Sequence, residues 1–195
     1  MQIELINTGS ELLLGRVLNT HQQWIGKKLA DAGYILSSQV TVPDTAESIC
    51  DAVQKALGRA DLVITTGGLG PTSDDITRER ISAQFNKPLQ KNVAIVEHIT
   101  SFFSQRKRPM PESVLVQAMV PEGALVFQNE YGTAPGLAMP VPSERSNIGN
   151  SQSWLVMLPG PPRELRPMVE KYLSLIHISE PTRPRLISYA VFCLK

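Results

Sequence analysis

"ADLVITTGGLGPTSDDITRE", residues 60–79, joins an apolar run to a glycine-rich turn and then begins a polar, helix-like pattern. A short apolar run that ends in glycines predicts a buried strand over 60–68. The pattern after the turn predicts a helix over 73–86, with Ser73 or Asp74 as its N-cap. A buried strand followed by a helix is typical of a parallel α/β sheet.

The same alternation of strand and helix occurs on both sides of this stretch. Apolar runs predict strands over 3–9, 34–42 and 154–160. Helical periodicity predicts helices over 17–32, 45–58 (with Thr45 as N-cap) and 92–108. Short apolar segments between 119 and 160 predict a hairpin. We therefore predict a three-layer α/β/α sandwich with a mostly parallel sheet and right-handed crossovers.

Composition narrows the class of protein. The chain has 195 residues, of which 42% are hydrophobic and 19% charged, as expected for one globular domain. A formal net charge of +1 with mixed signs predicts neither a nucleic-acid nor a membrane partner. Cys50 and Cys193 are too few and too far apart for a disulfide framework. Without a signal peptide or an apolar span, we expect a cytoplasmic protein with a small-molecule partner.

The glycine-rich turn is the first candidate site. Gly67, Gly68 and Gly70 allow a ligand to approach backbone amides closely, and Thr66 adds a hydroxyl donor. The spacing matches neither a Walker loop nor a dinucleotide fingerprint. We interpret the turn as a phosphate-binding loop, and the alternative is a tight turn in which Asp74 acts only as a cap.

Carboxylates near the strand ends form the second candidate. Free backbone amides attract an anion, whereas the Asp74 and Asp75 carboxylates would repel it. A phosphate that binds together with a divalent cation can interact favourably with both the amides and the carboxylates. Both are candidate metal ligands; we expect Asp74 near the cap and Asp75 in the cleft, as ligand or orienter of an attacking water. Asp44 and Glu11 also follow predicted strands, with a turn or cap and helix-dipole stabilisation as their alternatives.

Three loops, "NTGSE", "TTGG" and "MLPGPP", begin where predicted strands end, so we expect them to share one cleft. His21 and His98 are isolated from any serine or cysteine at triad spacing, which gives nucleophilic catalysis no support. The basic run 106–108 is more typical of a solvated helix end than of a binding site.

Six blocks in the same order resemble the amino-terminal domain of the CinA family, which shares its fold with the MoaB and MogA proteins. They are "GSELLLGRVLNT", "VPDT", "TTGGLGPTSDDITRE", "QAMVPEGA", "NEYGTAPG" and "LPGPPREL". The resemblance runs from residue 1 to about residue 172, which we take as the domain. One departure is His21, where many members of the family carry asparagine.

The resemblance implies an enzyme that hydrolyses the pyrophosphate of ADP-ribose or a similar nucleotide with Mg²⁺ or Mn²⁺. Asp44 and Asp75 would be catalytic, and the ligand would also contact Gly132, Thr133 and Gly160. The alternatives are a non-catalytic nucleotide- or molybdopterin-binding module and a molybdopterin adenylyltransferase. Self-association of relatives leaves a homo-oligomer open.

The end of the chain departs from this pattern. Residues 173–195, "LSLIHISEPTRPRLISYAVFCLK", resemble translated sequencing adapter when they are read back as codons. We expect them to form no part of the domain. The nicotinamide mononucleotide deamidase domain that follows in the family is then absent, and its activity is not expected here.

Overall fold

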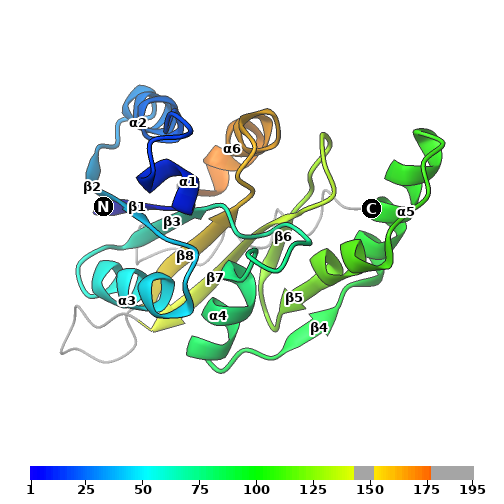
Figure 1. Cartoon of the computed structure of the whole chain (residues 1–195). Helices are drawn as coiled ribbons and strands as arrows, with labels where there is room; N and C mark the ends of the chain where they lie inside the picture. Colours follow the sequence, from blue (N-terminus) through cyan, green and yellow to red (C-terminus); the bar gives the residue numbers. More distant parts are fainter. Residues whose placement is uncertain (143–151, 177–195) are drawn as a thin grey trace.

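The computed structural model describes residues 1–142 and 152–176 (Figure 1). Its strands are β1 (Ile3–Thr8), β2 (Leu36–Val42), β3 (Leu62–Thr66), β4 (Leu89–Lys91), β5 (Met119–Pro121), β6 (Leu125–Phe127), β7 (Gly136–Pro142) and β8 (Gln152–Leu158). Its helices are α1 (Ser10–Leu13), α2 (His21–Asp31), α3 (Ala46–Leu57), α4 (Thr77–Gln84), α5 (Val93–Gln105), the 3₁₀ helix η1 (Glu112–Ala118) and α6 (Pro162–Ile176).

One sheet of six strands, in the order β2-β1-β3-β8-β7-β6, organises the molecule. The strands β2, β1, β3 and β8 are parallel, and β7 pairs antiparallel with both β8 and β6. In the parallel part Asn7 lies beside Thr66, and Thr66 lies beside Leu158. The carboxyl ends of β1, β3 and β8 therefore meet at one edge of the sheet.

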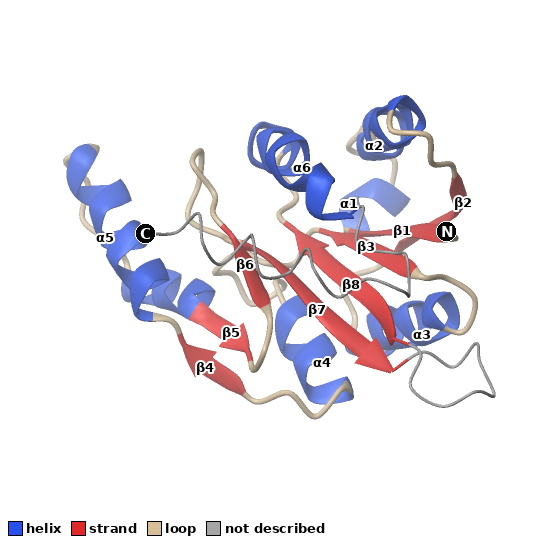
Figure 2. Cartoon of the chain, turned by 180° about the vertical axis from the view of Figure 1, so that it is seen from behind, coloured by secondary structure: helices blue, strands red, loops and turns tan. Residues whose placement is uncertain are grey.

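Helices cover both faces of this sheet. Figures 1 and 2 show α2 and α6 on one side and α3 and α4 on the other, with α5 and the β4–β5 pair beside them. Strand residues alternate accordingly: Leu5, Ile64 and Val156 pack in the core of α2 and α6. Ile6 and Val63 pack in the core of α3 and α4. The predicted three-layer sandwich with a mostly parallel sheet is confirmed.

Some predicted boundaries differ from the structure. The helix expected over 17–32 begins only at His21, after the separate short helix α1. Similarly, the helix expected over 92–108 ends at Gln105, before Lys107 adopts a positive φ. Thr45 is the N-cap of α3 as predicted, since its hydroxyl accepts from the Ser48 N–H at 3.4 Å.

The predicted cap of α4 is wrong. Neither Ser73 nor Asp74 caps this helix, which begins at Thr77 with Ile76 in the N-cap position and no side-chain cap. The Thr77 N–H donates instead to the Gly68 carbonyl at 3.1 Å. Ser73 and Asp74 therefore belong to the loop that precedes α4 and not to the helix.

The limits of the described residues affect two predictions, one on the end of the chain and one on the stretch before β8. The backbone of residues 173–176 continues α6, and the rest of the expected adapter-derived tail, 177–195, lies outside the described residues. Within the stretch for which we predicted a hairpin, residues 143–151 also lie outside the described residues. Within the described ranges, every helix is too short or too polar for a membrane crossing.

We expect Ile64→Ala to lower the free energy of unfolding by about 2–5 kcal/mol, because the substitution leaves a cavity in the core of the sheet. Ile64 is 1% exposed, whereas Ile35, just before β2, is 80% exposed. The matched control Ile35→Ala should change stability by no more than about 0.5 kcal/mol. Urea unfolding of the two variants measures both values, and equal losses would contradict the assigned core.

Candidate functional site

A cleft of about 600 Å³ opens where β1, β3 and β8 end. The three loops expected there all line it, which confirms that they share one cleft. Among the predicted site residues, the lining includes Glu11, Asp44, Thr66, Gly67, Gly68, Gly70, Asp74, Asp75, Thr133 and Gly160. Gly132 is not in the lining, because it packs behind the wall against the Glu164 carboxylate.

The turn after β3 is possible only with glycines at two positions. Gly67 has a φ of 98°, and a Cβ there would lie 2.7 Å from the Thr8 carbonyl oxygen. Gly68 has a φ of 67°, and a Cβ there would collide with the Thr77 side chain. The turn is therefore held between the end of β1 and the start of α4.

The amides of this turn are not equivalent. The Gly67 N–H donates to the Leu158 carbonyl at 2.9 Å, so it is committed to the sheet rather than to a ligand as we expected. Within the described residues, the N–H groups of Gly68, Leu69 and Gly70 donate no hydrogen bond. All three residues line the cleft, so their amides are candidates to bind an anion there.

Asp75 folds back over the turn. Its Oδ2 accepts from the Thr72 N–H at 3.0 Å and from the Thr72 hydroxyl at 2.5 Å, and its carboxylate lies against Gly70. The described residues supply no donor to its Oδ1. Asp74 is exposed, and among the described residues its carboxylate accepts only from the Ser73 hydroxyl, at 3.3 Å. Both carboxylates line the cleft, and Asp75 is the more firmly positioned.

Asp44 reaches the cleft from the loop after β2. Its Oδ2 accepts from the Ser10 N–H at 2.8 Å, and its own N–H donates to the Ser10 hydroxyl at 3.2 Å. These two bonds tie the β2 loop to the start of α1. Glu11, the next residue of α1, is exposed and lines the same side of the cleft.

A buried amide under the cleft orients Thr66. Asn7 is 0% exposed, and its Oδ1 accepts from Asn19 at 3.0 Å and from Gln39 at 2.9 Å. Its Nδ2 must therefore be the group that donates to Thr66 Oγ1, at 2.7 Å. Thr66 Oγ1 is the acceptor in this bond, so its own proton is free to donate elsewhere. Sequence reasoning missed Asn7 and Asn19, although Asn7 begins the quoted loop "NTGSE" and Asn19 stands in the quoted block "GSELLLGRVLNT".

His21 also belongs to the cleft, which sequence reasoning did not predict. It begins α2, is 9% exposed, and its Nε2 lies 2.7 Å from the Gly160 carbonyl oxygen. Burial lowers its pKa, the bond to Gly160 opposes this, and the charge of Arg166 adds to the lowering. The neutral ring then donates from Nε2, which leaves Nδ1 as a buried acceptor without a partner in the described part of the chain. His98 instead lies on α5, with Nε2 3.1 Å from the Gly132 carbonyl oxygen.

A further wall consists of the segment around Thr133 and the first turn of α6. Gln117, from η1, lines it and donates to the Leu69 carbonyl at 3.4 Å, which braces the glycine turn from behind. Glu164 lies 8% exposed in the first turn of α6. Burial raises its pKa, while a hydrogen bond from Asn129 and the charge of Arg163 oppose the shift.

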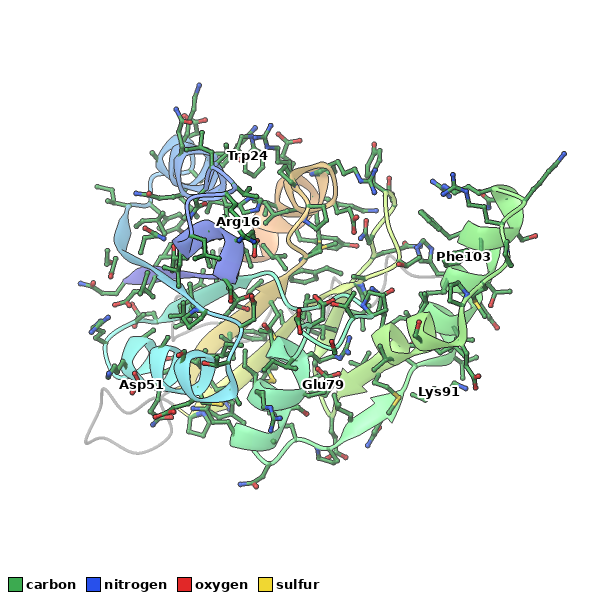
Figure 3. The ribbon with its side chains drawn as sticks, in the orientation of Figure 1. Arg16, Trp24, Asp51, Glu79, Lys91 and Phe103 are labelled. Atoms are coloured by element: carbon green, nitrogen blue, oxygen red, sulfur yellow. The ribbon has the colours of Figure 1, made fainter. Side chains whose placement is uncertain are left out.

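The lining of the cleft is acidic. Its carboxylates are Glu11, Asp44, Asp74, Asp75 and Glu164. The described residues contribute no lysine or arginine to this lining, and Arg16, labelled in Figure 3 on the segment after α1, is exposed outside it. Over the same residues, no group of three or more His, Cys, Asp or Glu side chains is arranged to hold a metal ion by itself.

Comparisons with known proteins place this geometry in a family. A family model described as "Probable molybdopterin binding domain" matches residues 4–178. The CinA-like proteins of Akkermansia muciniphila and Kosmotoga olearia are each 44% identical to this chain over 170 residues, or 87% of it. The chain spans 39% of the length of each of these two relatives.

Solved structures agree with the sequence comparisons. The protein CinA from Thermoplasma acidophilum matches with a TM-score of 0.75 and 28% identity, covering 90% of this chain and 97% of that one. The tungsten cofactor synthesizing protein MoaB from Pyrococcus furiosus matches with a TM-score of 0.60 and 19% identity, covering 91% and 93%. The latter likeness concerns the fold alone. The chain therefore belongs to the probable molybdopterin-binding domain family and is a MoaB-like domain of the CinA type.

Proposed function

We propose that this cleft hydrolyses the pyrophosphate of ADP-ribose or a similar nucleotide with the help of a divalent cation. The observation that carries the proposal is the composition of the cleft: open amides at Gly68–Gly70 beside carboxylates, with no lysine or arginine in the described lining. The amides attract a phosphate, whereas the carboxylates repel it. A phosphate ligand of this cleft therefore needs a cation with it.

The carboxylates suit Mg²⁺ or Mn²⁺ bound together with a phosphate. Asp44 uses Oδ2 to hold the start of α1, and Asp75 uses Oδ2 to hold Thr72 of its own segment. This leaves Oδ1 of each for a cation or a water molecule. Mg²⁺ is usually held by one or two carboxylates, with water and substrate phosphate oxygens completing its shell. The lack of a three-residue metal cluster in the described part fits such a shared site better than a protein-only site.

Each group of the cleft would have its own role in hydrolysis. Amides of Gly68, Leu69 and Gly70 would hold the phosphoryl oxygens on which negative charge develops, and Thr66 would donate its free proton to the same group. Asp75 would orient the attacking water and accept its proton at Oδ1, and Asp44 and Asp74 would then be the carboxylates that hold the cation. A bound cation supplies charge neutralisation and lowers the pKa of water. Attack on one phosphorus breaks the P–O–P bond and releases AMP and ribose 5-phosphate.

A non-catalytic module that holds a nucleotide or a molybdopterin is the second candidate. The same amides and carboxylates would serve it, and the solved relatives include proteins named for molybdopterin biosynthesis. Because binding groups do not by themselves produce turnover, AMP release separates the two functions. An adenylyltransferase would instead consume ATP and transfer its nucleotidyl group to a pterin.

We expect Asp75→Asn to lower metal-dependent AMP release from ADP-ribose by at least about 100-fold, because the amide cannot accept the proton of the attacking water. The amide oxygen can still accept from Thr72, so the turn should keep its shape. Asp44→Asn should act in the same direction but less strongly. The control is Asp51→Asn on α3, which makes the same change outside the cleft (Figure 3). Chromatography of AMP measures each rate, and an Asp75→Asn rate within a few-fold of wild type would contradict the assignment.

Removal of divalent cations should abolish AMP release, and Mg²⁺ or Mn²⁺ should restore it. Titration calorimetry with AMP should show affinity at least about tenfold higher with Mg²⁺ than with EDTA, equivalent to about 1.4 kcal/mol. The reason is the repulsion between phosphate and the carboxylates of the lining. Equal affinity in the two buffers would show that the protein alone neutralises the phosphate.

A further inference from the structure

Glu164 lies between two cavities of the structure. It lines the main cleft and also a second cavity of about 360 Å³, which includes Asn129, Tyr131 and Lys171 in its lining. The side chain is nearly buried, in the first turn of α6, where the helix dipole favours a negative charge. A buried carboxylate needs partners for its oxygens, so the partners that it has and lacks are informative.

One oxygen of Glu164 is held in place. Its Oε2 accepts from Asn129 Nδ2 at 2.8 Å. Asn129 is itself fixed, because Nδ2 also donates to the Ala134 carbonyl at 2.8 Å and Oδ1 accepts from the Tyr131 N–H at 3.0 Å. Gly132 lies so close that a Cβ there would collide with the carboxylate. The segment 129–134 therefore determines how Glu164 is oriented.

The other oxygen is open. Within the described ranges no donor forms a hydrogen bond with Glu164 Oε1, and the Arg163 Nε lies 3.8 Å away, beyond hydrogen-bond distance. Since Glu164 lines the main cleft, a ligand there can supply the missing donor.

The chemistry of this oxygen restricts what it can bind. A carboxylate accepts hydrogen bonds and repels phosphate, so it needs an O–H or N–H group of a ligand. The amino-pyrimidinone edge of a pterin pairs with both oxygens of a carboxylate, and here Asn129 already occupies one. A sugar hydroxyl needs only one. In a nucleotide the hydroxyl-bearing ribose is attached directly to the phosphate that the Gly68–Gly70 amides attract.

We propose that Glu164 binds a ribose hydroxyl of the ligand through Oε1, and so selects ribonucleotides within this cleft. The inference rests on the nucleotide class of the proposed function but not on its hydrolysis. The hydrolysis proposed above assigns no role to Glu164, and Glu164 does not hold the phosphate.

The test measures binding of AMP, 2′,3′-dideoxy-AMP and inorganic phosphate by calorimetry in Mg²⁺. None of these probes contains a P–O–P bond, so turnover does not interfere. A hydrogen bond to a charged group predicts that the wild type binds AMP about tenfold or more tighter than the dideoxy analogue. Glu164→Gln should reduce this ratio to about one to three, because its amide presents a donor or a neutral acceptor. The substitution should not weaken phosphate binding, because it removes one of the negative charges that repel phosphate. The control Glu97→Gln, exposed on α5 outside both cavities, should keep the wild-type ratio.

Glu164→Asp provides a second variant that keeps the charge but shortens its reach, and it should also lose the preference. A wild-type ratio near one, no binding of AMP, or a folded Glu164 variant that keeps the tenfold preference would each overturn the inference. The hydrolysis proposal fails separately: AMP preference without release of AMP from ADP-ribose would leave Glu164 as a ribose contact in a binding module.

Discussion

The double-glycine turn after β3 is the constraint on which the cleft depends. Gly67 lies against the Thr8 carbonyl, and Gly68 lies against Thr77. These two contacts bring the end of β1, the end of β3 and the start of α4 together without a side chain between them. Among the described residues, the amides of Gly68, Leu69 and Gly70 that follow have no hydrogen-bond acceptor. A larger residue at either position would displace the loops that carry the carboxylates.

The candidate catalytic carboxylates have a structural task as well as the chemical one that we propose. Asp44 ties the β2 loop to α1, and Asp75 ties the segment before α4 to itself. Each task uses one carboxylate oxygen and orients the other. Groups that are oriented before a ligand arrives need little reorganisation during a reaction. An alanine at Asp44 or Asp75 would remove the loop hydrogen bonds together with the carboxylate, so a loss of activity would have two causes. Asn at either position keeps an oxygen that can accept the loop hydrogen bonds.

Much of the fold could be predicted from sequence because its strands are short apolar runs between helical patterns. The alternation of Leu5 and Ile6 between the two cores follows directly from the period of a strand. The α4 cap could not be predicted, because Ser73 and Asp74 have cap-like residue types and only the Thr77–Gly68 bond moves the helix start.

Only some residues of the candidate cleft could be predicted from the sequence, because only some have a local sequence signal. Asp44 and Asp75 follow strand ends that share an edge of the sheet, so local pattern and topology suffice to bring them to the cleft. The environments of His21 and Glu164 depend on partners distant in the chain, Gly160 and Asn129 respectively. An isolated histidine or a first-turn glutamate has no local sequence signal that distinguishes such a role from an ordinary surface position.

The acidic lining has a thermodynamic consequence for any phosphate ligand. Where cation and phosphate each reduce the repulsion that the other meets, their binding is coupled, and the coupling is reciprocal: each raises the affinity of the other by the same factor. Under the proposed function, nucleotide occupancy of the cleft would then vary with the free concentration of divalent cation, even when the amount of nucleotide is constant. A carboxylate-rich wall to which the described residues add no lysine or arginine would thereby make recognition of the phosphate ligand depend on a bound cation.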